Sequence, residues 1–484
     1  MNAPVRRLAI VVAGLFAALL VSTTMIQFVF AADLNARPDN RRTLLATYAR
    51  ERGEILVGQT AVARSTPTDD EYRFQREYDQ GKLYAHVTGF YSFFGAGGGL
   101  EQAENSLLSG SSDKLFYRRI SDLFTGRKPQ GANVETTLDA SVQEVAAKAL
   151  GSQRGAAVAI DPKTGAILAM VSSPSYDPNT LAGHDLNTVG KTYDALNADP
   201  DRPLLNRAIG GDLYPPGSVF KIVTAAAALS SGNYTEDSVL PGPAVLNLPQ
   251  TSADLPNAFD GSCGPGDKVT LTQAMTISCN TAFASLGMDI GAKALQTQAA
   301  KFGFGDSITI PMRVTPSSVP EQLNAPQLAQ AAIGQYDVRS TPLQMAMVAA
   351  GVANKGVVMA PYLVQSVIGS DLSVIESATP TELSDAVTPD VAAQLTRMMV
   401  SVVDNGSGRR AQLPGVQVAG KTGTAQHGEG RRAHAWFVSF APANDPKIAV
   451  AVIVEDGGND RSESGGGAVA APIAKKMMEA RLNE

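Results

Sequence analysis

Histidine and cysteine are scarce in this sequence: its 484 residues include four histidines and two cysteines. Neither type occurs in the close pairs that hold zinc, so we expect no metal site and no cofactor. A basic excess is also missing, because the formal net charge is −6. Without a positive field to grip a phosphate backbone, nucleic acid is excluded as an expected partner. The length exceeds one ordinary hydrophobic core, which predicts two domains beyond any targeting segment.

Charged side chains are absent from Leu8 to Phe30. A helix of about 23 residues reaches roughly 34 Å, enough to cross a hydrocarbon core of about 30 Å. Arg6 and Arg7 precede this run, as in the n-region of an export signal. The alternative is a signal peptide cleaved near Val29-Phe30-Ala31, but the run exceeds the usual cleavable length, which favours a retained anchor. In either case the bulk of the chain is exported, and retention predicts a single-pass protein of the cell membrane.

The two cysteines, Cys263 and Cys279, lie close together in the sequence. In an exported protein such a pair is expected to form one structural disulfide. Closing a loop of about 15 residues would restrict the unfolded chain by roughly 3 kcal/mol on the loop-entropy model. The alternative is a pair of buried free thiols.

Sequence patterns divide the chain into three segments. Residues 1–31 are expected to form a cytoplasmic leader and transmembrane anchor, residues 32–133 a small N-terminal domain and linker, and residues 134–484 the second domain. The glycine-rich run Gly95–Gly99 suits a turn or hinge, and the polar stretch 118–133 is typical of a linker.

The second domain has strand patterns at both ends and a mostly helical middle. Apolar and β-branched runs predict strands at 134–138, 156–160, 166–171, 416–419, 435–440 and 448–455. Asp139 is a plausible N-cap of a following helix. The pattern predicts an α+β fold, in which an antiparallel sheet unites distant parts of the sequence and helices pack beside it.

The strongest local signal is Tyr214-Pro215-Pro216-Gly217-Ser218, followed by an apolar helix pattern. Proline suits the lead-in to a helix, so the helix is predicted to begin at Ser218. Lys221 is the charged residue of that helix and, three positions after Ser218, it shares the serine's face. Burial and the positive end of the helix dipole both disfavour an ammonium, so a neutral lysine could take the serine proton.

Short motifs of this kind recur by chance, and context separates the copies. A second Ser-x-x-Lys at 111–114 lies in a polar stretch, a Ser-x-Asn at 231–233 lies at the helix end, and a Lys-Thr-Gly at 163–165 lies at a hairpin tip. The retained motifs are Ser218…Lys221, Ser278…Asn280 and Lys421-Thr422-Gly423-Thr424.

In this order, the three motifs resemble those of the penicillin-binding protein and serine β-lactamase superfamily. Arg52–Ile55 and Gly99–Glu101 are similar to N-terminal signatures of class B penicillin-binding proteins, and Thr341–Ala346 to a segment of their transpeptidase domain. The resemblance covers nearly the whole chain after the anchor and is strongest to the compact actinobacterial penicillin-binding protein A type. It implies a transpeptidase domain with an antiparallel sheet and a mostly helical subdomain. A small α+β pedestal or dimerisation-like domain and one transmembrane helix would precede that domain.

The resemblance also implies a role for each motif residue. Ser218 would be the acyl-accepting nucleophile, Lys221 its base, Ser278 a proton shuttle and Asn280 a holder of Lys221 and the substrate amide. Lys421 and Thr422 would bind the substrate carboxylate, Gly423 would allow close approach, and the N–H groups of Ser218 and Thr424 would form the oxyanion hole. The implied substrate is the D-Ala-D-Ala end of a peptidoglycan stem peptide, and the implied product is a cross-link. β-Lactams and divisome or elongation proteins are the other implied partners.

Alternatives remain beside this expectation. Cys279 occupies the middle of the Ser-x-Asn motif, so a disulfide would tether the active site and could make it redox-sensitive. A β-lactamase or β-lactam sensor would share the fold, but Glu321–Asn324 is one residue short of the Glu-x-x-x-Asn that holds a hydrolytic water. A non-catalytic divisome scaffold is a further alternative. His427 and His434 are expected to be surface or structural residues, and Trp436 a core residue.

Overall fold

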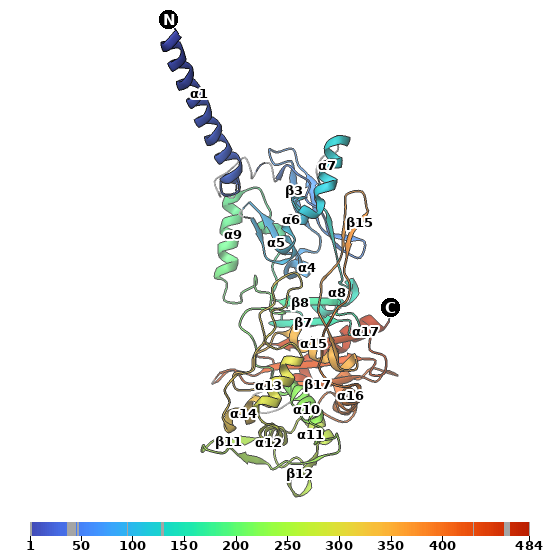
Figure 1. Ribbon diagram of the computed structural model, residues 1–484. Coiled ribbons are helices and arrows are strands. Elements are labelled where there is room, and N and C mark those ends of the chain that lie inside the picture. The colour runs from blue at the N-terminus through green and yellow to red at the C-terminus, as the bar shows by residue number, and fades with distance from the viewer. Residues whose placement is uncertain are drawn as a thin grey trace.

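The structure is a computed structural model that describes residues 2–35, 45, 48–93, 95–126, 130–428, 430–458 and 465–483. Helix α1 (Asn2–Thr24) projects from one end of the molecule (Figure 1) and continues as a π-helical turn, η1 (Met25–Val29), before the short α2 (Ala31–Asn35). Ala3–Val29 is long and apolar enough to cross a membrane, and its most apolar window has no buried surface. The predicted spanning segment is therefore one exposed apolar helix.

A six-stranded sheet forms the centre of the region next to α1. Its strand order is β15-β14-β6-β1-β2-β3. The strands are β1 (Ile55–Val57), β2 (Thr60–Pro67), β3 (Phe74–Tyr78), β6 (Asn133–Thr136), β14 (Val364–Ile368) and β15 (Val374–Ser377). The hairpin β14–β15 comes from the far part of the sequence and pairs with β6, with Val367 opposite Val134. Residues that the predicted boundary places in the second domain thus complete the first domain's sheet.

Short helices and one hairpin surround this sheet. They are α4 (Gly81–Thr88), β4 (Phe90–Ser92), β5 (Gly95–Gly97), α5 (Gly99–Ala103), α6 (Asn105–Leu108), the 3-10 turn η2 (Asp113–Leu115) and α7 (Phe116–Thr125). Two predictions need correction. The stretch 118–133 is not simply a linker, because α7 covers its start. The glycine-rich run 95–99 is not simply a turn, because β5 pairs with β4.

An ion cluster joins the two N-terminal motifs singled out in the sequence. Glu101 is fully buried, and its two carboxylate oxygens accept from Arg52 Nε at 2.6 Å and Arg76 Nε at 2.7 Å. Burial alone would raise the pKa of Glu101, but the two guanidiniums outweigh burial and lower its pKa below the ordinary value. The cluster thus fixes α5 to the sheet through a charge that is paired twice.

The second region is built on an antiparallel five-stranded sheet of order β17-β18-β19-β7-β8. The strands are β7 (Gly155–Ile160), β8 (Ile167–Ser173), β17 (Ala419–Ala425), β18 (His434–Ala441) and β19 (Ile448–Val454). Strand β19 pairs with β7, so distant parts of the sequence meet in one sheet, as predicted. The predicted strand at 416–419 is wrong in place, because the strand begins at Ala419 and contains the Lys-Thr-Gly motif itself.

Helices cover both faces of this sheet. Alternate strand residues face opposite sides: Phe437 packs in the core with α8 (Ala140–Leu150) and α17 (Ala471–Leu482), whereas Trp436 packs with α10 (Lys221–Ser230) and α15 (Pro342–Ala353). A π-helical turn, η7 (Gly466–Ala470), leads into α17. Burial on both faces explains why β7, β8, β18 and β19 appear in the sequence as largely continuous apolar runs.

A helical subdomain with short hairpins lies at the end opposite α1 (Figure 1). Its helices are η4 (Gly217–Phe220), α11 (Leu271–Thr276), α12 (Asn280–Ile290), α13 (Ala292–Lys301), α14 (Ala325–Ala331) and α16 (Pro389–Asp404). The 3-10 turn η3 (Pro178–Leu181) and helix α9 (Leu186–Ala198) lie instead beside the N-terminal region (Figure 1). The short strands are β9 (Val239–Pro241), β10 (Val245–Asn247), β11 (Asp254–Pro256), β12 (Lys268–Thr270), β13 (Val357–Met359) and β16 (Glu382–Asp385). The 3-10 turns η5 (Pro265–Asp267) and η6 (Arg409–Ala411) complete the set.

Candidate active site

A cleft of about 570 Å³ opens between the edge strand β17 and the helical subdomain. Three of the predicted motif residues line it, one from each motif: Ser218, Asn280 and Thr424. Residues 253–260 form one wall, and Gln330, Ile333, Gln335 and Gln426 contribute to the remaining lining. The volume falls within the usual range of small-ligand pockets, so the cleft can hold a peptide end.

Ser218 lies on the 3-10 turn η4, so the helix begins one residue earlier than predicted and with tighter geometry. Gly217 has φ of +54°, and a Cβ there would meet Thr424 O at 2.8 Å. Glycine at this position therefore allows the serine turn to lie against β17. The lead-in is also fixed, because Gly217 N–H donates to Gly334 O at 2.8 Å and Trp436 Nε1–H donates to Pro215 O at 3.1 Å.

Lys221 is fully buried at the start of α10, one turn beyond Ser218. Its Nζ contacts Asn280 Oδ1 at 2.7 Å, Ser278 O at 2.8 Å and Ser278 Oγ at 3.2 Å. The amine is thus held by both ends of the Ser-x-Asn motif.

Ser278 lies between two lysines. Its Oγ accepts from Lys421 Nζ at 2.7 Å and lies 3.2 Å from Lys221 Nζ, and Lys421 Nζ also donates to Thr422 O at 2.8 Å. Ser278 has φ of +61°, the left-handed region that a residue other than glycine rarely adopts. Such backbone strain persists where the surroundings over-determine the conformation, and it clusters at functional sites.

The residues of β17 take different positions around the cleft. Thr424 lines it, whereas Thr422 is fully buried and its Oγ1 lies 2.6 Å from Ser407 Oγ. A Cβ on Gly423 would lie 3.0 Å from both Trp436 Cβ and Val219 Cγ1. Glycine 423 therefore lets the strand and the serine turn pack closely.

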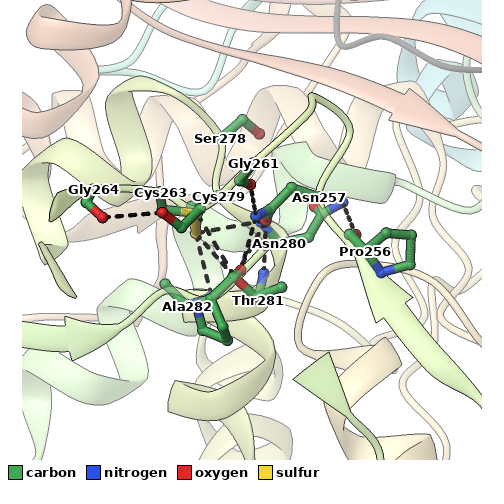
Figure 2. Close-up of a disulfide and its surroundings, with 12 residues drawn as sticks. Pro256, Asn257, Gly261, Cys263, Gly264, Ser278, Cys279, Asn280, Thr281 and Ala282 are labelled. Atoms are coloured by element: carbon green, nitrogen blue, oxygen red, sulfur yellow. Dashed lines mark hydrogen bonds between the residues drawn. A yellow bond between two sulfur atoms is a disulfide. The ribbon is translucent and has the colours of Figure 1, made fainter. Parts of the chain in front are cut away.

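The predicted disulfide joins Cys263 to Cys279 (Figure 2). Both cysteines are buried, and Cys279 is the N-cap residue of α12, where its sulfur accepts from Ala282 N–H at 3.3 Å. Cys263 follows the loop that forms the cleft wall. The bridge thus links this wall to the Ser-x-Asn motif.

Removing the bridge is expected to lower the free energy of unfolding by about 3 kcal/mol. We would replace Cys263 with alanine and Cys279 with serine, because serine is a better N-cap acceptor than a sulfur and α12 keeps its cap. Thermal unfolding measures the loss, and the rate of acylation by penicillin measures the effect on the site. Reductant should reproduce the variant's behaviour in the wild-type chain and leave the variant unchanged. An acylation rate that neither treatment alters would mean that the tether has no role in the reaction.

The other singled-out residues lie outside the cleft lining. Trp436 is fully buried, as expected of a core residue. His434 stacks on His427, and burial together with that neighbour lowers the pKa of His434 to about 4. His427 Nε2 lies 2.7 Å from Asp456 Oδ1. Both histidines therefore have protein partners away from the cleft lining, and their expected surface or structural role stays a prediction.

Sequence reasoning missed the cleft wall at 253–260 and two polar residues that hold the motifs. Ser407 supports Thr422, and Asn257 lies beside Asn280, where Asn280 N–H donates to Asn257 Oδ1 at 3.0 Å. Neither residue belongs to a motif, and each meets its partner across more than a dozen residues of intervening chain. No local pattern could have identified them.

Two known protein-family models match most of the chain. Residues 155–479 match the penicillin binding protein transpeptidase domain, and residues 52–134 match the penicillin binding protein A dimerisation domain. A relative from Mycolicibacterium smegmatis, the peptidoglycan D,D-transpeptidase PbpA, is 47% identical over the full length of both chains. Its counterpart in Mycobacterium tuberculosis is 45% identical and is covered over 99% of its length.

Solved structures support the same assignment. The imipenem acyl-enzyme complex of penicillin-binding protein A from M. tuberculosis superposes with a TM-score of 0.86 at 44% identity, covering 90% of this chain and all of that one. The penicillin G acyl-enzyme complex of the same protein has a TM-score of 0.85 at the same coverage. With its motif residues gathered at one cleft and both regions matched, this chain belongs to the penicillin-binding protein transpeptidase family.

Proposed function

We propose that this chain is a peptidoglycan D,D-transpeptidase that cross-links stem peptides through an acyl-enzyme on Ser218 and is acylated by β-lactams at the same residue. The observation that carries the proposal is the set of contacts behind the cleft. Lys221, Ser278 and Lys421 form one chain of hydrogen bonds, and Ser218, Asn280 and Thr424 line the cleft in front of it.

Acylation begins with Lys221 as the base. A neutral amine has two N–H bonds, which match Asn280 Oδ1 and Ser278 O, and one lone pair. Ser278 Oγ also lies 3.2 Å from this nitrogen, and we assign to the lone pair the Ser218 proton in the acylation step. Ser218 Oγ then attacks the carbonyl of the penultimate D-Ala and forms a C–O bond. The N–H groups of Ser218 and Thr424 stabilise the oxyanion of the tetrahedral intermediate.

Collapse of that intermediate breaks the C–N bond to the last D-Ala. Lys221 holds the proton taken from Ser218, and Ser278 passes a proton from Lys221 on to the leaving amine. Lys421 stabilises the Ser278 oxygen during this transfer. In the second half, an amine of a neighbouring stem attacks the ester carbonyl and loses a proton through the same path. Ser218 recovers its hydrogen, and the product is an amide cross-link.

Substrate binding uses strand β17. As an edge strand of the sheet, β17 has backbone groups that no neighbouring strand pairs, and these can bind an extended peptide as an added strand. Thr424 supplies a hydroxyl at the cleft lining for the terminal carboxylate, and Gly423 keeps the strand close to Ser218. Lys421 and Thr422, the other expected carboxylate ligands, are fully buried behind the lining, so Lys421 would attract the carboxylate by its charge and Thr422, whose hydroxyl faces Ser407, would support the strand. Asn280, from the cleft lining, would bind the substrate amide.

The N-terminal segments would anchor the enzyme in the membrane and hold the catalytic domain outside the cytoplasm. We assign residues 1–31 to a leader and retained membrane anchor, residues 32–133 to a pedestal or dimerisation-like domain, and residues 134–484 to the catalytic domain, which lies outside the cytoplasm. The exposed apolar helix Ala3–Val29 and the matched dimerisation region support this assignment. Divisome or elongation proteins would recruit the enzyme through the N-terminal region.

The cleft lining argues against a β-lactamase. Among the described residues, its acidic side chains are Asp254 and Asp260, on the wall loop, and the lining contains no glutamate. Glu321 lies outside the lining, and Asn324 from the same string serves as the N-cap of α14. Neither residue is placed to hold a hydrolytic water beside Ser218, so a long-lived β-lactam adduct is expected.

A stem-peptide thioester or depsipeptide, supplied with and without an acceptor amine, tests the proposal. We expect the acceptor to divert most of the acyl-enzyme from hydrolysis to amide formation, and chromatography with mass spectrometry measures the ratio. If the acceptor amine does not change the rate or yield of hydrolysis, the chain is instead a carboxypeptidase. Failure of Ser218 to acquire any acyl group would reject both activities and favour a scaffold.

A further inference from the structure

Asn257 lies where the cleft wall meets the Ser-x-Asn motif. It belongs to the wall loop at 253–260, and its side chain points toward the start of α12 (Figure 2). Asn257 is 8% exposed, so its amide groups need protein partners. Asn257 therefore belongs to the cleft lining, together with the residues next to it in the chain, and its side chain contacts the Ser-x-Asn motif.

The first N–H groups of helix α12 need hydrogen-bond acceptors, and its N-cap residue, Cys279, accepts from one of them. The first N–H groups of a helix have no partner within the helix. At the N-cap, Cys279 offers a disulfide sulfur, which accepts weakly and serves Ala282 N–H. Asn257 Oδ1 accepts the two N–H groups before it, from Asn280 at 3.0 Å and Thr281 at 3.2 Å. A side chain from outside the helix thus completes the cap.

The other end of the same amide holds the wall. Asn257 Nδ2 donates to Pro243 O at 3.1 Å and to Gly261 O at 3.2 Å. Both N–H groups of the amide thus have an acceptor, and its oxygen, which also lies 3.3 Å from the Thr281 hydroxyl, has at least two donors. An aspartate would keep an acceptor oxygen but lose both donors, and an alanine would lose every contact of the amide.

Asn280 connects the contacts of Asn257 to the proposed base, Lys221. Asn280, whose backbone Asn257 holds, contacts Lys221 Nζ with its own side chain at 2.7 Å. We infer that Asn257 is a positioning residue for acylation: its amide clamps the cleft wall and the N-terminus of α12 as one unit and thereby holds Asn280 against Lys221. This inference rests on the proposed function, since acylation of Ser218 is the step that it serves.

The test compares Asn257→Ala with Asn257→Asp in full-length protein, using a fluorescent penicillin over a range of concentrations. The limiting acylation rate of Asn257→Ala is expected to fall about 10- to 100-fold, as misplaced catalytic groups do. The concentration for half-maximal rate should change little. Asn257→Asp keeps the cap oxygen, so its limiting rate should stay within about threefold of wild type although its thermal stability falls.

Asn247→Ala is the matched control, because Asn247 Nδ2 donates to Asp254 Oδ1 at 2.7 Å within the same hairpin without touching α12. It should acylate at the wild-type rate. A change confined to the half-maximal concentration, equal loss of rate in the alanine and aspartate variants, or a wild-type rate in Asn257→Ala would each overturn the inference. If Asn257→Ala does not fold, Asn257→Ser carries the same test, since its shorter hydroxyl cannot reach both the cleft wall and the N-terminus of α12. A wild-type chain that penicillin does not acylate would instead reject the proposed function.

Discussion

Replacing Ser218 with alanine is expected to abolish the covalent penicillin adduct and to lower cross-linking by at least about 10⁴-fold. Ser218 is the motif hydroxyl that lies at the cleft one turn before Lys221, the proposed base. Thr424 also lines the cleft, but it is expected to orient the substrate and not to attack. Intact-protein mass spectrometry after incubation with penicillin G measures the adduct directly.

Ser111→Ala is the matched control for this experiment. Ser111 begins the second Ser-x-x-Lys string, which lies in the N-terminal region after α6 and far in sequence from the cleft. Its loss should leave the adduct unchanged. An adduct on the Ser218→Ala variant would falsify the assignment of the nucleophile, and full complementation of a deletion by that variant would favour a scaffold.

Lys221→Met is expected to slow acylation by about 10³- to 10⁴-fold, in line with loss of a general base. Methionine fills a similar volume but has no lone pair that can take the serine proton. It also leaves Ser278 O and Asn280 Oδ1 without their lysine partner, so the variant should be less stable as well. Stopped-flow or quenched-flow rates with a labelled penicillin measure the change.

Lys114→Met separates the base from general effects of losing a lysine. Lys114 is exposed and forms an ion pair with Glu376, and exposed pairs contribute little to stability. Its loss should therefore not alter the acylation rate. If Lys221→Met acylated within tenfold of wild type, another group would have to be the base, and Lys421, bonded to the same Ser278 oxygen, would be the first to test.

Much of the site could be predicted from the sequence, because the motifs are local and their order along the chain is informative. A buried apolar helix after two prolines distinguishes Ser218 from Ser111, and the same logic separates the two Lys-Thr-Gly copies. The antiparallel sheet also follows from strand patterns at both ends of the second region. The predicted strand at 416–419 was misplaced because glycine, alanine and lysine, which are depleted in strands, make up most of Ala419–Ala425, whereas pairing with β18 forms the strand there.

The remaining features depend on contacts between distant residues. Asn257 has no motif around it, and its role comes from an approach to Asn280 that only the folded loop creates. Helix α7 overlaps the start of the predicted linker, and its apolar residues Phe116, Ile120 and Phe124 recur at helical spacing, a signal that the polar composition of 118–133 masked. The β14–β15 hairpin lies in the middle of the second region and shows no local sign that its partner is β6.

That hairpin has a consequence for any attempt to divide the protein. Strand β6 pairs with β14 on one side and with β1 on the other, and a cut between residues 133 and 134 would fall at its first residue. The N-terminal piece would lose β6, and the catalytic piece would keep β6 with its β1 side unpaired. Bare strand edges recruit other chains, so the truncated catalytic piece should aggregate.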